Sequence, residues 1–169
     1  MEMIIMTSNT KSPTVKLVEF HEQYTHQLSN FSLPEDQLEF TSLPLEKINH
    51  PKVSKTSIHV LVMSNNEPVG YFALEDGEKV HKYSDNPKAR ILTSFSIDSK
   101  FQGKGLAKQG LKLLPSFVKN VLPDINEVVL GVNKRNRAAI NLYLKCGFVD
   151  EKQMYEGPKG PQYVLHLII

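Results

Sequence analysis

The residues with the clearest capacity for chemistry form a small turn at residues 102–107, with the sequence Gln-Gly-Lys-Gly-Leu-Ala. An apolar run at 91–97 precedes it, and a helical pattern starts near Gly105. The first N–H groups of a helix lack intrahelical partners, and the helix dipole adds partial positive charge there. Because Gly103 and Gly105 carry no Cβ, phosphate oxygens could approach the backbone closely. The turn therefore predicts a pyrophosphate cradle, with tight turning and packing as the alternative.

The spacing of these glycines fits neither of two common nucleotide motifs. No G-x-x-x-x-G-K-[ST] run is present, and G-x-G-x-x-G fails because Lys108 stands where the third glycine belongs. The early strand of a dinucleotide-binding unit is also missing. A nucleotide-bearing ligand other than a nucleoside triphosphate or NAD is therefore favoured.

A second group of residues follows the predicted strand at 127–132. In the helical pattern after it, Asn136, Ile140 and Tyr143 recur at i, i+4 and i+7, which places them on one helix face. Tyr143 then lies about 10 Å along the axis from Asn136. The structural alternative is that Asn136 caps the helix and Tyr143 borders the core. A capping role is compatible with a functional one.

Together the two segments closely resemble the Gcn5-related N-acetyltransferase (GNAT) superfamily. The family's pyrophosphate-loop pattern, Gln/Arg-x-x-Gly-x-Gly/Ala, is matched at Gln102, Gly105 and Ala107. The family's later pattern, Asn-x-x-Ala-x-x-Leu-Tyr-x-Lys-x-Gly-Phe, is matched at Asn136, Ala139, Leu142, Tyr143, Lys145, Gly147 and Phe148. Both patterns occur in this order with a strand between them, and the resemblance covers about residues 57–148.

The resemblance implies that acetyl-CoA is the acyl donor and lies between two splayed parallel strands, here 91–97 and 127–132. A β-bulge in the first of these strands would turn backbone groups toward the pantetheine arm. The residues that the resemblance places around acetyl-CoA are Phe95, Ser96, Ile97, Gln102, Gly103, Lys104, Gly105, Leu106, Ala107, Lys108, Asn136, Ala139 and Tyr143.

The activity that the resemblance implies is transfer of an acetyl group to a primary amine by direct attack. By the family pattern, Tyr143 is the general acid that protonates the CoA thiolate, because a phenol with a pKa of about 10 stays protonated at neutral pH. A backbone N–H near Phe95 or Ser96 would stabilise the oxyanion. The rival interpretation is a GNAT-fold module that binds acetyl-CoA without turnover, as a sensor or interaction module.

The general base and the acceptor are not defined by the sequence. Some family members carry a Glu near the start of the bulged strand, where this chain has Ile91, Leu92 and Thr93. Proton removal through water, or binding of an already neutral amine, is therefore expected. The acceptor is a small molecule or a peptide N-terminus. Four residues could border its site: Glu75, Asp76, His81 and Tyr83.

Three other groups of residues have mainly structural interpretations. Cys146 sits at the packed end of a helix and is expected to be a structural thiol. The six histidines show no metal-ligand spacing, so no metal is predicted. The basic cluster of Lys134, Arg135 and Arg137 could meet the CoA 3′-phosphate or simply face solvent.

The predicted fold class is α/β, as a GNAT fold with a mixed, mostly antiparallel sheet of six to seven strands. A splayed central parallel pair and helices on both faces complete it. Strands are expected at 14–20, 57–63, 68–74, 91–97, 127–132, 148–155 and 162–168. Helices are expected at 22–31, 33–38, from 44, at 105–121 and at 136–146. Pro115 predicts either a kink in the long fourth helix or two shorter helices, and the continuing apolar spacing favours the kink. Residues 75–88 are expected to be a charged loop.

Bulk properties exclude several classes of protein. The 169 residues suit one domain, 1–169, with 1–13 as a loose leader. A net charge of +2 argues against non-specific nucleic-acid binding. No apolar stretch is long enough to span a membrane, no signal peptide is evident, and the single Cys fits the cytoplasm. Exposed edge strands near the C-terminus would permit a homodimer.

Overall fold

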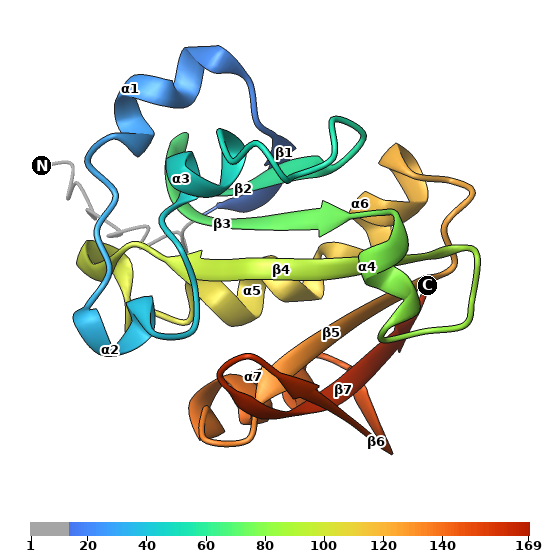
Figure 1. The fold of residues 1–169 in the computed structure, drawn as a ribbon. Helices are drawn as coiled ribbons and strands as arrows, with labels where there is room; N and C mark the ends of the chain where they lie inside the picture. Colours follow the sequence, from blue (N-terminus) through green and yellow to red (C-terminus); the bar gives the residue numbers. More distant parts are fainter. Residues whose placement is uncertain (1–13) are drawn as a thin grey trace, which may run out of the picture.

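The computed structural model describes residues 14–169, which form one seven-stranded sheet with helices on both faces (Figure 1). The leader expected at 1–13 lies outside the described residues. In sheet order the strands are β1 (Val15–Glu19), β2 (Ile58–Ser64), β3 (Glu67–Glu75), β4 (Ala89–Ile97), β5 (Glu127–Asn133), β7 (Gly160–Ile168) and β6 (Val149–Gly157). Among these, β4 and β5 pair in parallel and the other neighbours are antiparallel. The predicted fold class is confirmed.

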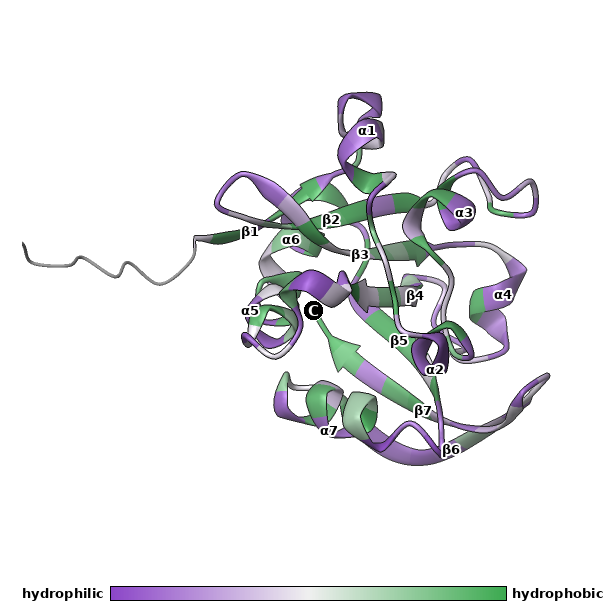
Figure 2. Ribbon diagram, turned by 90° about the vertical axis from the view of Figure 1, so that its left-hand side faces the viewer, coloured by the Kyte–Doolittle hydropathy of each residue, from purple (hydrophilic) through white to green (hydrophobic). Residues whose placement is uncertain are grey.

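Alternating side chains divide the sheet into two buried faces. Val60 and Val62 pack with the helices that follow β4, whereas Leu61 packs with Leu28 on the opposite face. Figure 2 shows α3 and α4 on one side of the sheet and α5 and α6 on the other. The helices are η1 (Glu22–Tyr24), α1 (Thr25–Leu28), α2 (Glu35–Leu38), α3 (Pro44–Ile48), α4 (Glu78–His81), η2 (Ser99–Phe101), α5 (Leu106–Lys112), α6 (Leu114–Val121) and α7 (Arg137–Lys145).

Two expectations about helices are wrong. The segment 105–121 is not one kinked helix but two, α5 and α6, with Pro115 in the first turn of α6. Proline has no N–H to donate to the preceding turn, whereas the first turn of a helix needs none. The Leu113 N–H instead bonds to the Gly110 carbonyl at 3.0 Å and closes α5. The charged segment 75–88 also contains a short helix, α4, and its first residue, Glu75, ends β3.

The central parallel strands separate after a short stretch of pairing. Their matched residues end at Ile91 and Val129, so the next residues of both strands have no partner across this junction. In β4, Ser94 and Phe95 together oppose the single residue Phe72, and Ser94 has φ of 56°. This is a β-bulge, in the strand for which the family resemblance implies one. The bulge and the early end of pairing open the sheet at its centre.

The sheet ends at β6, whose outer edge is unpaired within the described residues. Val149 and Met154 on this strand are about half exposed. The homodimer expected through such an edge stays a prediction. Within residues 14–169, no helix has both the length and the apolar character needed to cross a membrane.

Candidate active site

A cavity of about 740 Å³ opens where β4 and β5 separate. All but one of the residues expected around the acyl donor line it: Phe95, Ser96, Ile97, Gln102, Gly103, Gly105, Leu106, Ala107, Lys108, Asn136, Ala139 and Tyr143. The exception is Lys104, whose ammonium lies over the Phe101 ring, 5.6 Å from its centroid. Residues far apart in the sequence, from the turn after β4 and from α7, therefore meet at one cavity.

The glycine turn borders the cavity with a backbone that other residues rarely adopt. Gly103 and Gly105 have φ of 76° and 77°, in the left-handed region. A Cβ added at Gly103 would meet nothing within 4 Å, and one at Gly105 only the Gln109 side chain at 3.8 Å. The glycines are therefore required by the turn's conformation rather than by close packing against the protein. Helix α5 begins directly after these glycines, so its first N–H groups, which lack intrahelical partners, lie at the cavity wall.

The Gln102 side chain forms hydrogen bonds that join the glycine turn to β4 and α2. Its side-chain Nε2 donates to the Ile97 carbonyl at 2.7 Å and to Gln37 Oε1 at 2.9 Å. Gln37 Nε2 donates in return to Gln102 Oε1 at 3.2 Å. These bonds join the turn to the end of β4 and to α2. The Gln102 side chain thus positions the turn.

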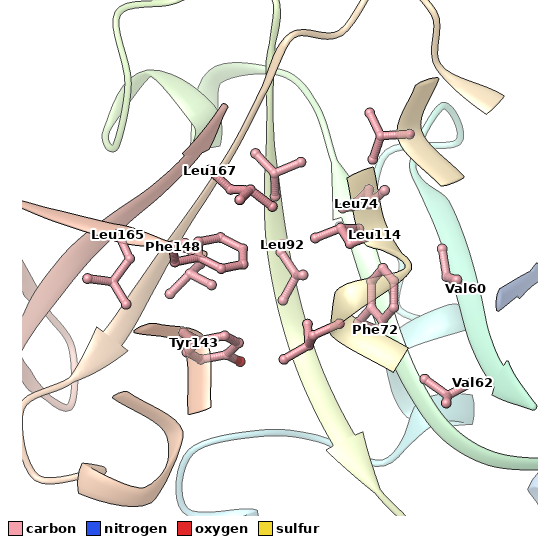
Figure 3. Close-up of a cluster of buried hydrophobic side chains, with 14 of the residues drawn as sticks. Val60, Val62, Phe72, Leu74, Leu92, Leu114, Tyr143, Phe148, Leu165 and Leu167 are labelled. Carbon is pink, nitrogen blue, oxygen red and sulfur yellow. The ribbon is translucent and has the colours of Figure 1, made fainter. Parts of the chain in front are cut away.

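Helix α7 carries Asn136 and Tyr143 to the opposite wall. The Asn136 side chain caps the helix by accepting the Ala139 N–H at 3.3 Å. The Tyr143 ring packs edge-on against Phe148 and Phe95, with centroids 5.5 and 6.2 Å away, and its contact with the core is visible in Figure 3. Burial, with a smaller contribution from Cys146, raises the pKa of the Tyr143 phenol. Its phenol is therefore protonated throughout the neutral range.

A buried ionic cluster lies beside the cavity on the face of α3 and α4. The Glu75 carboxylate, 7% exposed, is 3.0 Å from Lys47 Nζ and 3.1 Å from Lys79 Nζ, and it accepts the Thr93 hydroxyl. Burial alone would raise the pKa of Glu75. The Thr93 hydrogen bond and the two lysines outweigh that effect and hold the pKa below its usual value. Lys47, Lys79 and Thr93 line the cavity, whereas Glu75 is shielded behind them.

Of the other residues expected to border the acceptor, Tyr83 lines the cavity. Its hydroxyl donates to Gln162 Oε1 at 3.0 Å. Both side chains lie so close to Gly131 that an added Cβ would be 2.2 Å from Gln162 Oε1 and 2.6 Å from Tyr83 Cε1. Gly131 therefore marks a place where two side chains approach the β5 backbone closely. Asp76 instead accepts the Thr56 hydroxyl, and His81 borders a separate hollow beside Glu127.

The remaining sequence candidates lie outside the cavity lining. The Cys146 thiol contacts the Lys108 carbonyl at 3.9 Å, and burial raises its pKa even though Lys112 and Lys108 act in the opposite sense. Both features fit the structural role expected for this thiol. Arg135 pairs with Glu39 at 3.0 Å. Among residues 14–169, no group of three or more His, Cys, Asp or Glu side chains could hold a metal ion.

Sequence reasoning missed Lys47 and Thr41, which line the cavity from the segment before β2. That segment matches no chemical pattern, so nothing singled out either residue. For Lys79 a signal was available, because it stands four residues after Glu75.

Comparisons with known proteins agree with this geometry. Residues 19–148 match the model of the acetyltransferase (GNAT) family. The chain is 36% identical over 153 residues to the uncharacterized N-acetyltransferase YbbJ of Bacillus subtilis (strain 168), covering 90% of this chain and 96% of YbbJ. It is 29% identical over 150 residues to spermidine N(1)-acetyltransferase of Escherichia coli (strain K12), covering 83% and 75% of the two chains.

Solved structures share the fold. The aminoglycoside acetyltransferase AAC(6′)-Ib, in complex with paromomycin and acetyl-CoA, superimposes with a TM-score of 0.72 at 20% identity, covering 92% of this chain and 93% of that one. Spermidine N-acetyltransferase from Vibrio cholerae, in complex with CoA and spermine, gives a TM-score of 0.63 at 17% identity, with 91% and 95% covered.

Proposed function

The chain belongs to the acetyltransferase (GNAT) family, and from that premise we propose that it transfers an acetyl group from acetyl-CoA to a primary amine in the cavity between β4 and β5. The single observation that carries the proposal is the meeting of the glycine turn, the β4 bulge and Tyr143 at one cavity. A family likeness alone would leave open whether the parts of the site come together.

The cavity suits acetyl-CoA in three respects. The open space around Gly103 and the unpaired N–H groups of α5 can receive the pyrophosphate. Past Ile91, the edge of β4 that faces β5 has no strand partner. The amides of the pantetheine arm can therefore form hydrogen bonds to this edge as an added strand would. The arm then points the thioester toward the bulge. The placement of the pantetheine arm and the thioester follows the family pattern.

The chemistry forms one bond and breaks one. The amine nitrogen attacks the thioester carbonyl carbon, the new N–C bond forms, and the C–S bond breaks to leave the CoA thiolate. Because burial raises the pKa of its phenol, Tyr143 is protonated at neutral pH, and it donates a hydrogen bond and then its proton to that sulfur as the C–S bond breaks. Backbone N–H groups at the bulge near Phe95 and Ser96 stabilise the oxyanion. The amine loses a proton to solvent, and a proton from solvent then reprotonates the Tyr143 phenolate.

Glu75 is unsuited to act as the general base. Two lysines and Thr93 occupy its carboxylate, and a depressed pKa makes it a weak proton acceptor. Removal of the amine proton therefore proceeds through water, or the amine binds already neutral. This agrees with the absence of a carboxylate at Ile91, Leu92 and Thr93.

Two assays test the proposal. Thermal unfolding should shift upward with acetyl-CoA but not with ATP or NAD, because only the former fills the pantetheine groove as well as the pyrophosphate cradle. Free-thiol release is then measured across amino acids, peptides, phosphorylated amines, polyamines and aminoglycosides, and acetylated product is identified by mass. An acetyl-CoA shift without any acetylated amine would favour a binding module that does not turn over. No shift with acetyl-CoA would remove the donor assignment.

A further inference from the structure

The charged residues of the cavity are predominantly cationic. Among residues 14–169, those that line it are Asp36, Lys47, Lys79, Lys108 and Lys159. Lys108 belongs to the first turn of α5, at the end assigned to the pyrophosphate. The other three lysines come from α3, α4 and the turn between β6 and β7, none of which belongs to the glycine turn or to α5. The one aspartate among these lining residues, Asp36, comes from α2.

Lys47 and Lys79 share a single counter-charge. Both ammonium groups contact Glu75, so two positive charges meet one negative charge. Each ammonium has three N–H donors, and the Glu75 contact uses one of them. Lys47 is buried, with 12% of its side chain exposed, so little water is available for its remaining donors. Burial, together with Lys79, accordingly lowers the pKa of Lys47. Because two ammonium groups share one carboxylate, a second anion would balance the charge of the cluster.

An unpartnered hydroxyl belongs to the same cavity. Thr41 Oγ1 is buried and has no hydrogen-bond partner within the described residues. It lines the cavity and lies in the segment between α2 and α3, six residues before Lys47. A buried hydroxyl without a partner is costly, and rotation of the Thr41 side chain would bring this one to a ligand in the cavity. A hydroxyl can donate to an anion.

We propose that the acceptor is an amine that also carries an anionic group, a carboxylate or a phosphate, and that Lys47 and Lys79 bind this group. The inference rests on the proposed acetyl transfer and specifies its acceptor. The anionic group takes no part in the bond changes; it orients the amine toward the thioester. A polycationic acceptor would bring like charges against Lys47 and Lys79, which are already in excess over Glu75.

The test compares amines that differ only in the anionic group. L-lysine is paired with cadaverine, which lacks its carboxylate, and O-phosphoethanolamine is paired with ethanolamine. kcat/KM is measured for each by thiol release, with product mass as the check. The expected result is a preference of about tenfold or more for the anionic member of at least one pair. The preferred pair distinguishes a carboxylate site from a phosphate site.

Variants locate the anion site. Lys79→Gln removes a partly exposed ammonium from the cavity wall and should reduce the preference within that pair to about threefold or less. Lys82→Gln makes the same change at an exposed lysine at the end of the same helix, outside the cavity lining, and should keep the preference. Because Lys79 is 45% exposed, its replacement should leave the fold intact.

Equal or better use of cadaverine and ethanolamine would overturn the inference while leaving acetyl transfer in place. Should no amine be acetylated, the melting temperature of the CoA complex is measured with each amine. Stabilisation by the anionic members alone would support the anion site even though turnover had failed. Equal stabilisation by both members, or by neither, would overturn it. If Lys79→Gln kept the same kcat/KM preference for the anionic amine, Lys79 would not be part of the anion site.

Discussion

The Tyr143 ring packs edge-on against Phe95, one of the two residues that form the bulge in β4, with ring centroids 6.2 Å apart. Phe95 in turn packs against Phe72 on the neighbouring strand, at 6.0 Å. The proposed proton donor on α7 therefore rests on the strand irregularity that opens the cavity. The position of the phenol and the shape of the bulge are coupled through one side chain.

Phe95→Ala should separate these two features. Loss of the ring removes contacts with Tyr143 and Phe72 and should cost about 2 kcal/mol in the free energy of unfolding. Turnover should fall about tenfold or more because the phenol is no longer held in place. Phe95→Leu keeps much of the packing volume and should lose less of both. Urea unfolding and thiol-release kinetics measure the two effects; an unchanged kcat in Phe95→Ala would show that the ring contact does not position Tyr143.

Gly103→Ala tests the pyrophosphate cradle. An alanine Cβ strains the left-handed backbone at φ of 76° and should cost about 1 kcal/mol in stability. It also narrows the space left for phosphate, so the Kd for acetyl-CoA should rise about tenfold or more. Gly77→Ala is the matched control, because Gly77 has φ of 86°, equally open surroundings and a place outside the cavity lining. Titration calorimetry should show a weakened Kd for the first variant only; equal Kd values would argue against the cradle.

Glu75→Gln should destabilise the protein in a pH-dependent way. Removing the carboxylate leaves Lys47 buried without its partner, at a cost of about 3 kcal/mol near neutral pH. Because the folded-state pKa of Glu75 is depressed, its contribution is complete above the unfolded-state pKa of about 4.3 and is lost as pH falls through the folded-state value. The stability gap from wild type should therefore be constant between about pH 5 and 7 and narrow below about pH 4.3.

Urea unfolding at several pH values measures that gap. Glu78→Gln removes an exposed carboxylate from the first turn of α4 and should change stability by less than about 0.5 kcal/mol. A gap that widens on acidification would contradict the assignment of Glu75 as an ionised partner of the two lysines.

Gly131→Ala should disturb the wall formed by Tyr83 and Gln162. The new Cβ would overlap both side chains, break their hydrogen bond and cost about 1–3 kcal/mol. On a Gln162→Ala background the same change should cost measurably less, because the nearer of the two overlaps is gone. Thermal unfolding of the four proteins gives this coupling. Additive effects would mean that Gly131 is not required by the approach of Gln162.

The sequence predicts the strands, and it predicts the residues of the glycine turn and of α7 that meet at the cavity, because both depend on local patterns. Continuous apolar runs joined by a polar turn mark β2 and β3, and the left-handed backbone at Gly103 and Gly105 restricts those positions mainly to glycine. Pro115 indicates a break in the helix at 105–121, whereas the periodic spacing of Leu114 and Phe117 favours one continuous helix. The structure has two helices, because proline has no N–H to donate and is accommodated in the first turn of α6.

The ionic cluster could not be predicted because its members come from separate elements. Lys47, Glu75 and Thr93 belong to α3, β3 and β4, and their contact depends on strand register. Only the spacing of Glu75 and Lys79 is visible locally, and it would equally fit a solvated helix face. The proposed acceptor side of the cavity is therefore a property of the tertiary structure.

The central claim is acetyl transfer with Tyr143 as the proton donor to the CoA sulfur. Its most direct test is kcat for Tyr143→Phe with the best acceptor found, because the variant removes one hydroxyl and keeps the ring contacts with Phe95 and Phe148. We expect the kcat of Tyr143→Phe to fall about 100-fold or more, with little change in acetyl-CoA affinity or melting temperature. A kcat equal to that of the wild type would contradict it.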